Sequence, residues 1–161
     1  MLGFMLTTIA EASGSEWQIR TAGTHVTEGS AMSGRTRDAL MKIEELGAHR
    51  YGGHRSHQLT EVDCEWADVI LAAEADNVRF VRTVFASHSH KAVQLAQFDR
   101  YASPNRTFGE QLGEAVAHEP SAEFDVVDPA GGDQASYDAC ARQLWNLAQT
   151  FALTIKDERA D

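Results

Sequence analysis

The chain has 161 residues, 43% of them hydrophobic and 24% charged, which favours one globular domain that buries roughly 70% of its unfolded surface. Twenty-four acidic residues against fourteen basic ones give a net charge of −10, which argues against partners such as nucleic acids or an anionic membrane surface. Cys64 and Cys140 form no Cys-x-x-Cys pair, so the sequence indicates neither a disulfide scaffold nor a zinc site, and it favours a reducing, cytoplasmic location.

The first residues predict a helix followed by a strand. Apolar side chains recur at helical spacing over residues 1–13, and Gly14 is a suitable residue to end such a helix. Residues 1–10 carry no basic side chain, which argues against an export sequence, and no apolar run in the chain approaches the ~20 residues of a membrane span. Over residues 16–22 apolar and polar side chains alternate, which predicts a half-exposed strand at or near a sheet edge.

A loop rich in glycine, serine and threonine over residues 23–34 leads to a second predicted helix. This helix covers residues 35–46, with Ser33 as its N-cap and Gly47 after its last turn. Residues 48–58 are polar and should form a loop. A short helical turn is expected within residues 59–66, where Thr60 can cap the first turn.

The second half of the chain predicts two more strands and two long helices. Residues 67–73 form an apolar run with one carboxylate, which is typical of a fully buried parallel strand, and a helix should follow over residues 75–85. Residues 92–95 should form a short strand, whereas residues 98–119 lack periodicity and should be a long loop with at most one helical turn. The strongest helix covers residues 136–155, and its inward face should carry Tyr137, Cys140, Leu144, Leu147, Phe151 and Ile155.

Alternating strands and helices predict right-handed βαβ units and an α/β fold of three layers, with helices on both faces of a parallel sheet. We expect residues 1–155 to form a single domain and residues 156–161 to be a charged tail. In such folds ligands bind beyond the C-terminal ends of the strands.

The stretch Asp125-Val126-Val127-Asp128-Pro129 lies between the predicted strands and the last helix. Proline disfavours helical backbone at the residue before it, so Asp128 should be extended on a stiff loop with its side chain held in one direction. Such a carboxyl group suits general acid catalysis. Taken alone, however, an Asp-Pro pair is more often a solvated turn before a helix.

Five stretches in the same order give a resemblance to a known family. They are Thr21-Ala22-Gly23-Thr24, His54-Arg55-Ser56-His57-Gln58-Leu59, Ala67-Asp68-Val69-Ile70-Leu71, Leu95 with Phe98, and Asp125-Val126-Val127-Asp128-Pro129. Together they resemble the low-molecular-weight protein tyrosine phosphatases, whose flavodoxin-like fold is shared with thioredoxin-linked arsenate reductases. The resemblance implies hydrolysis of a phosphomonoester on a protein or a small molecule, without a cofactor, and implies that Asp128 is the general acid.

In that family the nucleophile belongs to a Cys-x5-Arg loop that ends in Ser or Thr, between the first strand and the first helix. The loop turns its backbone N–H groups toward the phosphate, the helix start lowers the cysteine pKa, and the arginine grips two phosphate oxygens. The resemblance implies that Asp128 protonates the leaving oxygen and then activates water against the phosphocysteine.

No such loop occurs in residues 1–161. Ile70 lies six positions after Cys64 and Asn146 six positions after Cys140, where arginine is required. We interpret both cysteines as packing residues, Cys140 on the apolar face of the last helix. Aligned on Thr21-Ala22-Gly23-Thr24, the chain lacks the loop and the family's first, central strand. Either the true start lies upstream of Met1, which we favour, or the chain is a short form. As given, we expect it to be inactive.

The sequence is compatible with more than one substrate and more than one kind of partner. The family's substrate-shaping loop corresponds to His25-Val26-Thr27-Glu28, which has no aromatic residue. The family often has tyrosine after the Asp-Pro pair, where this chain has Ala130, which puts aromatic substrates in doubt. The alternative to an enzyme is a pseudophosphatase that binds a phosphorylated protein or a partner subunit. An open sheet edge would favour a homodimer. Arsenate reduction needs further cysteines near the middle of the chain, where Cys64 stands alone.

The remaining polar residues are interpreted as structural. The pairs His54 with His57 and His88 with His90 lack further ligands at metal-binding spacing, so we expect no metal site. Arg55 and Ser56 lie at a family position near the cleft, where structural hydrogen bonding is favoured over a role in the site. Asp125 is expected to start the acid loop rather than to act in catalysis.

Overall fold

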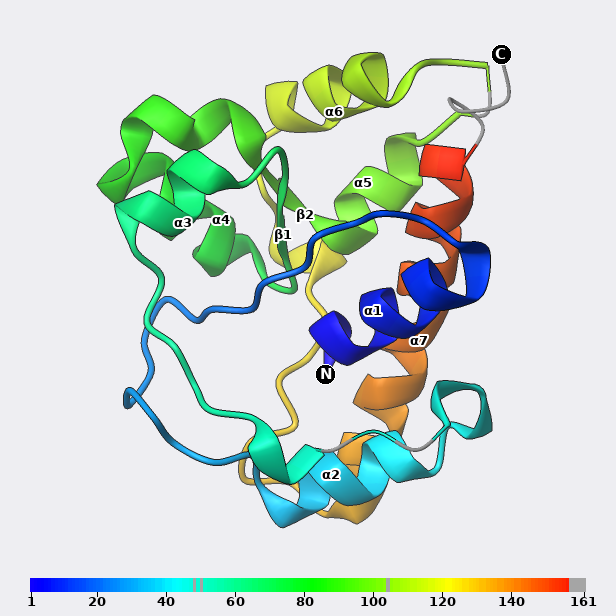
Figure 1. The fold of residues 1–161 in the computed structure, drawn as a ribbon. Helices are drawn as coiled ribbons and strands as arrows, with labels where there is room; N and C mark the ends of the chain where they lie inside the picture. The colour runs from blue at the N-terminus through cyan, green and yellow to red at the C-terminus, as the bar shows by residue number, and fades with distance from the viewer. Residues whose placement is uncertain (48, 50, 104, 157–161) are drawn as a thin grey trace. The chain divides into compact units, whose positions relative to one another are not determined.

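Two compact units, defined by contacts between residues, make up this chain. The computed structural model describes residues 1–47, 49, 51–103 and 105–156 (Figure 1). The first unit comprises Met1–Gln58 with Val127–Gln149, and the second comprises Leu59–Val126 with the residues from Thr150 onward. The single domain predicted over residues 1–155 stays a prediction, and most of the predicted tail, residues 157–161, lies outside the described residues.

The first helix, α1 (Leu2–Ser13), confirms the helix predicted over residues 1–13. It ends at Gly14, whose φ of 65° lies in the left-handed region that favours glycine. Ser15 donates its N–H to the Ala10 carbonyl at 2.9 Å, which satisfies one of the last carbonyls of the helix.

Helix α2 (Gly34–Met41) begins as predicted but is shorter. Ser33 Oγ accepts the N–H of Thr36 at 3.1 Å, which is the expected N-cap. The predicted helix over residues 35–46 is interrupted at Ile43, which leaves helical geometry (φ −91°, ψ 97°) and buries its side chain. A single 3₁₀ turn, η1 (Glu44–Leu46), follows and ends at Gly47.

The strand predicted over residues 16–22 is wrong. The expected faces are present, because Trp17 and Ile19 are half-buried while Gln18 and Arg20 are exposed. Across the described residues, however, the sheet has only two strands, and neither lies here. The segment's neighbour Gly23 makes an isolated bridge to Gln58. Side-chain alternation defines two faces, but a strand also needs the backbone of a partner.

The second unit contains a parallel pair, β1 (Ile70–Ala72) and β2 (Ala92–Gln94), with Ile70 opposite Ala92 and Ala72 opposite Gln94. Both strands are shorter than predicted, and β2 is fully buried whereas β1 is half-buried at its first two residues. Helix α3 (Glu61–Trp66) starts with a capping box between Thr60 and Asp63, and helix α4 (Ala75–Val84) follows β1. A hydrophobic cluster packs between these elements and contains Cys64, Ala72, Val78, Val81 and Ala92.

The long loop predicted over residues 98–119 is also wrong, because it contains two helices. Helix α5 (Leu95–Tyr101) directly follows β2, and helix α6 (Phe108–Ala117) starts at a capping box between Thr107 and Glu110. Phe98 is buried against Phe108 and Phe151, with ring centroids 5.8 Å and 5.3 Å apart. The remaining short turns are η2 (Tyr51–Gly53), η3 (Ala86–Lys91) and η4 (Ala122–Phe124).

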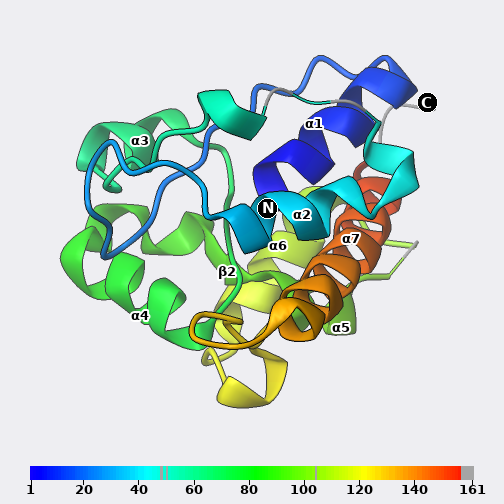
Figure 2. The ribbon, with the colours of Figure 1, turned by 90° about the horizontal axis from the view of Figure 1, so that it is seen from below.

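The last helix, α7 (Gln134–Lys156), confirms the helix predicted over residues 136–155, and Leu144 and Phe151 are buried as predicted, but the rest of its buried face is different. The buried side chains are Ala141, Leu144, Trp145, Ala148, Phe151 and Ala152. Near its start α7 lies beside α2 (Figure 2), where Lys42 Nζ is 2.5 Å from Asp138 Oδ2. No helix in the described part of the chain is long and apolar enough to cross a membrane.

Candidate functional site

Asp128 lies on an exposed turn that leads into α7. Its Oδ1 accepts the N–H of Ala130 at 2.9 Å, a local turn of the kind that aspartate forms with a residue two positions on. Gly132 then donates its N–H to the Pro129 carbonyl at 2.9 Å. Gly131 between them has a φ of 81°, which favours glycine. The hydrogen bond from Ala130 restrains the Asp128 carboxyl, and its role as general acid stays a prediction.

The start of α7 closes this turn. Asp133 Oδ1 accepts the N–H of Ser136 at 3.0 Å and its hydroxyl at 2.8 Å. These hydrogen bonds, from the backbone and then the side chain of Ser136, lower the pKa of the Asp133 carboxyl below its ordinary value. Asp133 is thus a helix cap and stays ionised near neutral pH.

Asp128 borders an open cavity of about 300 Å³. Its walls come from the turn and from the first turns of α7, and they include Pro129, Ala130, Ser136, Cys140 and Gln143. Cys140 is half-buried in this wall rather than packed in the core as predicted. The cause is the rotated face of α7, which places Ala141 and Trp145 inward.

Cys64 is a packing residue, as the sequence predicted. It is 0% exposed and belongs to the cluster under β1 and β2. Burial raises the pKa of the Cys64 thiol, and the carboxylates of Asp63 and Glu61 act in the same direction. A buried thiol that resists ionisation is a poor nucleophile.

A second cavity, of about 220 Å³, lies at the start of α1. Phe4, Thr7, Thr21 and His54 line it. Burial lowers the pKa of His54, with smaller contributions from the amino terminus and from Arg55, so the imidazole is neutral at physiological pH. A Cβ atom built on Gly3 would lie 2.2 Å from Thr21 Cγ2, which shows that α1 packs closely against Thr21.

The loop His25-Val26-Thr27-Glu28 is held by the residues before α3. Gln58 accepts the Val26 N–H at 3.2 Å and donates to the Thr24 carbonyl at 2.8 Å. Glu28 accepts the Gln58 N–H at 2.7 Å and lies 3.2 Å from His57 Nδ1. The sequence analysis did not single out Gln58, although Gln58 belongs to one of the stretches that gave the family resemblance.

Arg55 bonds to backbone rather than pointing into a site. Its Nη1 donates to the carbonyls of Gly52 at 3.0 Å and His54 at 2.7 Å. Ser56 exchanges backbone hydrogen bonds with Ser30 and Gly29. Both residues therefore have structural hydrogen bonds, the interpretation that the sequence favoured.

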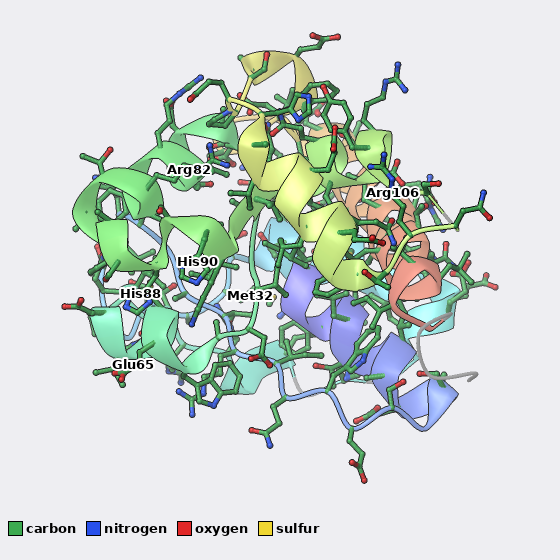
Figure 3. The ribbon with its side chains drawn as sticks, turned by 90° about the horizontal axis from the view of Figure 1, so that it is seen from above. Met32, Glu65, Arg82, His88, His90 and Arg106 are labelled. Carbon is green, nitrogen blue, oxygen red and sulfur yellow. The ribbon has the colours of Figure 1, made fainter. Side chains whose placement is uncertain are left out.

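The second histidine pair of the sequence lies close to one carboxylate. His88 and His90 lie on η3 near α3, which carries Glu65 (Figure 3), and His88 Nε2 is 3.9 Å from Glu61 Oε1. Among residues 1–47, 49, 51–103 and 105–156, no three His, Cys, Asp or Glu side chains are grouped so as to hold a metal ion.

Asp125 does not line the cavity with Asp128. Its Oδ1 accepts the Ala75 N–H, at the start of α4, at 2.7 Å, and accepts Gln94 Nε2 at 2.6 Å. These contacts support the prediction that Asp125 starts the loop. The contribution of Gln94 was not foreseen, because its partners lie 27 and 31 residues away.

Comparisons with known proteins concern the sequence and the fold of the chain. The family model described as low molecular weight phosphotyrosine protein phosphatase matches residues 3–161. A protein-arginine-phosphatase of Bacillus subtilis (strain 168) is 27% identical over 151 residues, which cover 94% of this chain and 84% of the relative.

Solved structures share the fold. The YwlE arginine phosphatase from Geobacillus stearothermophilus has a TM-score of 0.71 and 23% identity over 98% of this chain and 86% of that one. A low molecular weight protein tyrosine phosphatase from T. tengcongensis has a TM-score of 0.73 and 22% identity over 93% and 86% of the two chains. The predicted α/β class with a parallel sheet is confirmed.

Proposed function

The chain belongs to the low molecular weight phosphotyrosine protein phosphatase family, since the family model spans residues 3–161, and from this premise we propose that its site serves the hydrolytic removal of a phosphoryl group from a protein side chain. Asp128 is the general acid. It protonates the leaving atom of the substrate, which is the ester oxygen of a phosphomonoester or the guanidinium nitrogen of phosphoarginine, and, as the conjugate base, takes a proton from the water that attacks the phosphoenzyme. This assignment rests on one observation: the Asp128 carboxyl is exposed at the wall of a cavity on a turn restrained by Ala130 and Pro129.

The nucleophile is the missing part of this machinery. Neither cysteine of residues 1–161 is followed six positions later by arginine, and Cys64 is fully buried. Cys140 lies within a helix, so the residues after it continue α7 instead of curling their N–H groups around a phosphate. We therefore propose that residues 1–161 alone do not form a phosphocysteine and do not turn over substrate.

The walls of the cavity bear on the substrate. Pro129, Ala130 and Gly132 are small and provide no flat aromatic surface beside Asp128. The named relatives include phosphatases of arginine and of tyrosine. We propose a phosphorylated protein side chain as the substrate and place phosphoarginine ahead of phosphotyrosine, because a guanidinium group does not need an aromatic wall.

Two measurements test the enzymatic proposal. The first asks whether the reading frame upstream of Met1 encodes Cys-x5-Arg followed by Ser or Thr. If it does, the extended protein should release phosphate from a phosphoarginine peptide, and Asp128→Ala should lower kcat by about 10²–10⁴-fold, the usual contribution of a general acid. Asp133→Ala, which removes a neighbouring carboxylate that only caps α7, is the matched control. An Asp128→Ala enzyme with unchanged kcat would refute the assignment.

A second function follows from the same missing loop. A chain with the family's acid turn but no nucleophile could bind a phosphorylated protein without cleaving it. Titration of ¹⁵N-labelled protein with a phosphoarginine peptide should then shift the Asp128 and Ala130 amides, and the phosphate should remain on the peptide. Absence of any shift at millimolar peptide would exclude binding at this cavity.

The proposal also covers where the protein is located and whether it forms a dimer. Two free cysteines, one of them buried, suit a reducing compartment, and we propose that the protein is cytoplasmic. Within the described residues the sheet has two strands, and we propose that β1, whose first two residues are only half-buried, offers the edge that pairs with a second copy. A single monomeric species in sedimentation at micromolar concentration would count against a homodimer.

A further inference from the structure

The segment before Asp128 is bound to the ends of both strands. Asp125 Oδ1 accepts hydrogen bonds from Ala75, the first residue of α4, and from Gln94, the last residue of β2. The next residue, Val126, is 2% exposed and donates its N–H to the Ala73 carbonyl, directly after β1, at 3.0 Å. The chain is therefore fixed at Val126, two residues before the acid.

Gln94 is a polar residue in a position that packing alone would give to an apolar one. It is 0% exposed on a strand whose other residues, Ala92 and Val93, are apolar and buried. Its Nε2 donates to Asp125, and its Oε1 accepts the Ser121 N–H at 3.3 Å. A buried amide is costly unless it is hydrogen-bonded, and here both of its ends bind the segment that leads to Asp128.

Asp125 also caps the start of α4. The N-cap of α4 is Glu74, and its side chain makes no capping hydrogen bond. Asp125, 50 residues later in the sequence, caps the helix instead at 2.7 Å. A carboxylate at a helix start is favoured by the helix dipole, and its hydrogen bonds are charge-assisted. The contact thus ties the acid loop to a rigid element.

The link between Val126 and the acid is exposed. Val127 is 76% exposed, so its side chain anchors little. Beyond Asp128 the turn through Ala130 and Gly132 is local. The upstream end of the loop depends on the contacts of Asp125, Gln94 and Val126.

We propose that Gln94 and Asp125 are positioning residues for the acid Asp128, because together they fix the point from which its loop leaves the strands. The inference rests on the proposed function for the role of Asp128. It concerns the order of the loop, which can be measured without turnover.

Backbone order from ¹⁵N relaxation tests the proposal on residues 1–161. Four variants are compared with the parent chain: Asp125→Ala, Gln94→Glu, Asp125→Asn and Gln111→Glu. Gln94→Glu keeps the shape of the side chain but replaces the amide that donates to Asp125 with a carboxylate that repels it. Asp125→Asn keeps an oxygen that can accept from Ala75 and Gln94. Gln111→Glu is the matched control, because Gln111 is 1% exposed and donates Nε2 to the Arg106 carbonyl at 2.9 Å, away from the acid loop.

We expect the order parameters of the Val127, Asp128 and Ala130 amides to fall from about 0.85 to below about 0.6 in Asp125→Ala and Gln94→Glu. In Asp125→Asn they should stay near the parent values, and in Gln111→Glu they should not change even if that variant loses similar stability. The proposal is overturned if the first two variants leave these amides ordered, or if Gln111→Glu disorders them equally. If Asp125→Ala and Gln94→Glu do not fold, Gln94→Met, which removes both hydrogen bonds of the amide without adding a charge, replaces them, and a loop that stays ordered in this variant overturns the proposal.

Failure of the proposed function gives a different result. In that case the loop would still lose order in Asp125→Ala and Gln94→Glu, while the extended enzyme would show no dependence on Asp128.

Discussion

Replacement of Arg82 by methionine should destabilise the unit that carries β1 and β2. Arg82 lies on α4 beside the end of α6 (Figure 3). Its guanidinium donates to the carbonyls of Val116 at 3.0 Å, His118 at 3.2 Å and Ala92 at 3.3 Å. It therefore caps the last carbonyls of α6 and joins that helix to β2, the strand that carries Gln94.

The magnitude follows from these contacts. Hydrogen bonds that involve a charged group contribute about 1.5–3 kcal/mol each, so three of them give a gross term of several kcal/mol. Burial lowers the pKa of Arg82, which shows that desolvation of the guanidinium opposes part of this gain. Methionine keeps most of the apolar stem, so packing changes little. We expect a net loss of about 2–4 kcal/mol.

Urea unfolding followed by circular dichroism measures the loss, and the thermal midpoint should fall by about 5–15 °C for a chain of this length. Arg100→Met, at an exposed arginine of α5, is the control and should change stability by less than about 0.5 kcal/mol. An Arg82→Met protein as stable as the Arg100→Met control would show that the three carbonyls are satisfied equally well by water and would refute the reasoning.

Two further predictions concern titration and thiol chemistry. The pKa values of Glu110 and Asp133 are lowered by hydrogen bonds from the residues that they cap, Thr107 and Ser136. The stability that these two carboxylates contribute is therefore complete above their ordinary pKa values of 4.5 and 3.8, and it is lost as the pH falls through the lower values of the folded protein. In this pH range the stability of Glu110→Gln and Asp133→Asn should depend less on pH than that of the parent chain. Unchanged acid unfolding curves would contradict the caps. In the native protein at pH 8, iodoacetamide should modify Cys140 at least about tenfold faster than the buried Cys64, with equal rates in urea, as peptide mass spectrometry can measure; faster labelling of Cys64 would contradict its burial.

Local sequence patterns predicted the elements whose causes are local. The helices at residues 1–13 and 75–85 and the caps at Ser33 and Thr60 follow from spacing and capping residues within a few positions. Helix α6 was missed although Thr107 and Glu110 form a capping box, because Gly109 and Gly113 interrupt the apolar pattern of this segment. The box was the pattern that could have identified it.

The remaining errors concern contacts between distant residues. The alternation over residues 16–22 defines the correct faces, yet no neighbouring strand completes a ladder there among the described residues. The buried face of α7 depends on which alanines pack inward, and Ala141, Ala148 and Ala152 were not counted as core. The restraint on Asp128 by the following proline is local in the sequence, whereas its role as general acid was inferred from the family resemblance and stays a prediction. Gln94 was not identified, because its role depends on Ser121 and Asp125.

The central claim is that residues 1–161 contain the acid of a phosphatase but not its nucleophile. Release of inorganic phosphate from a phosphoarginine peptide and from an aryl phosphate by the purified chain tests it most directly, with Asp128→Ala measured in parallel. We predict no release above the buffer rate for either protein. Turnover by residues 1–161 that Asp128→Ala abolishes would show that a nucleophile is present among these residues and would contradict the account.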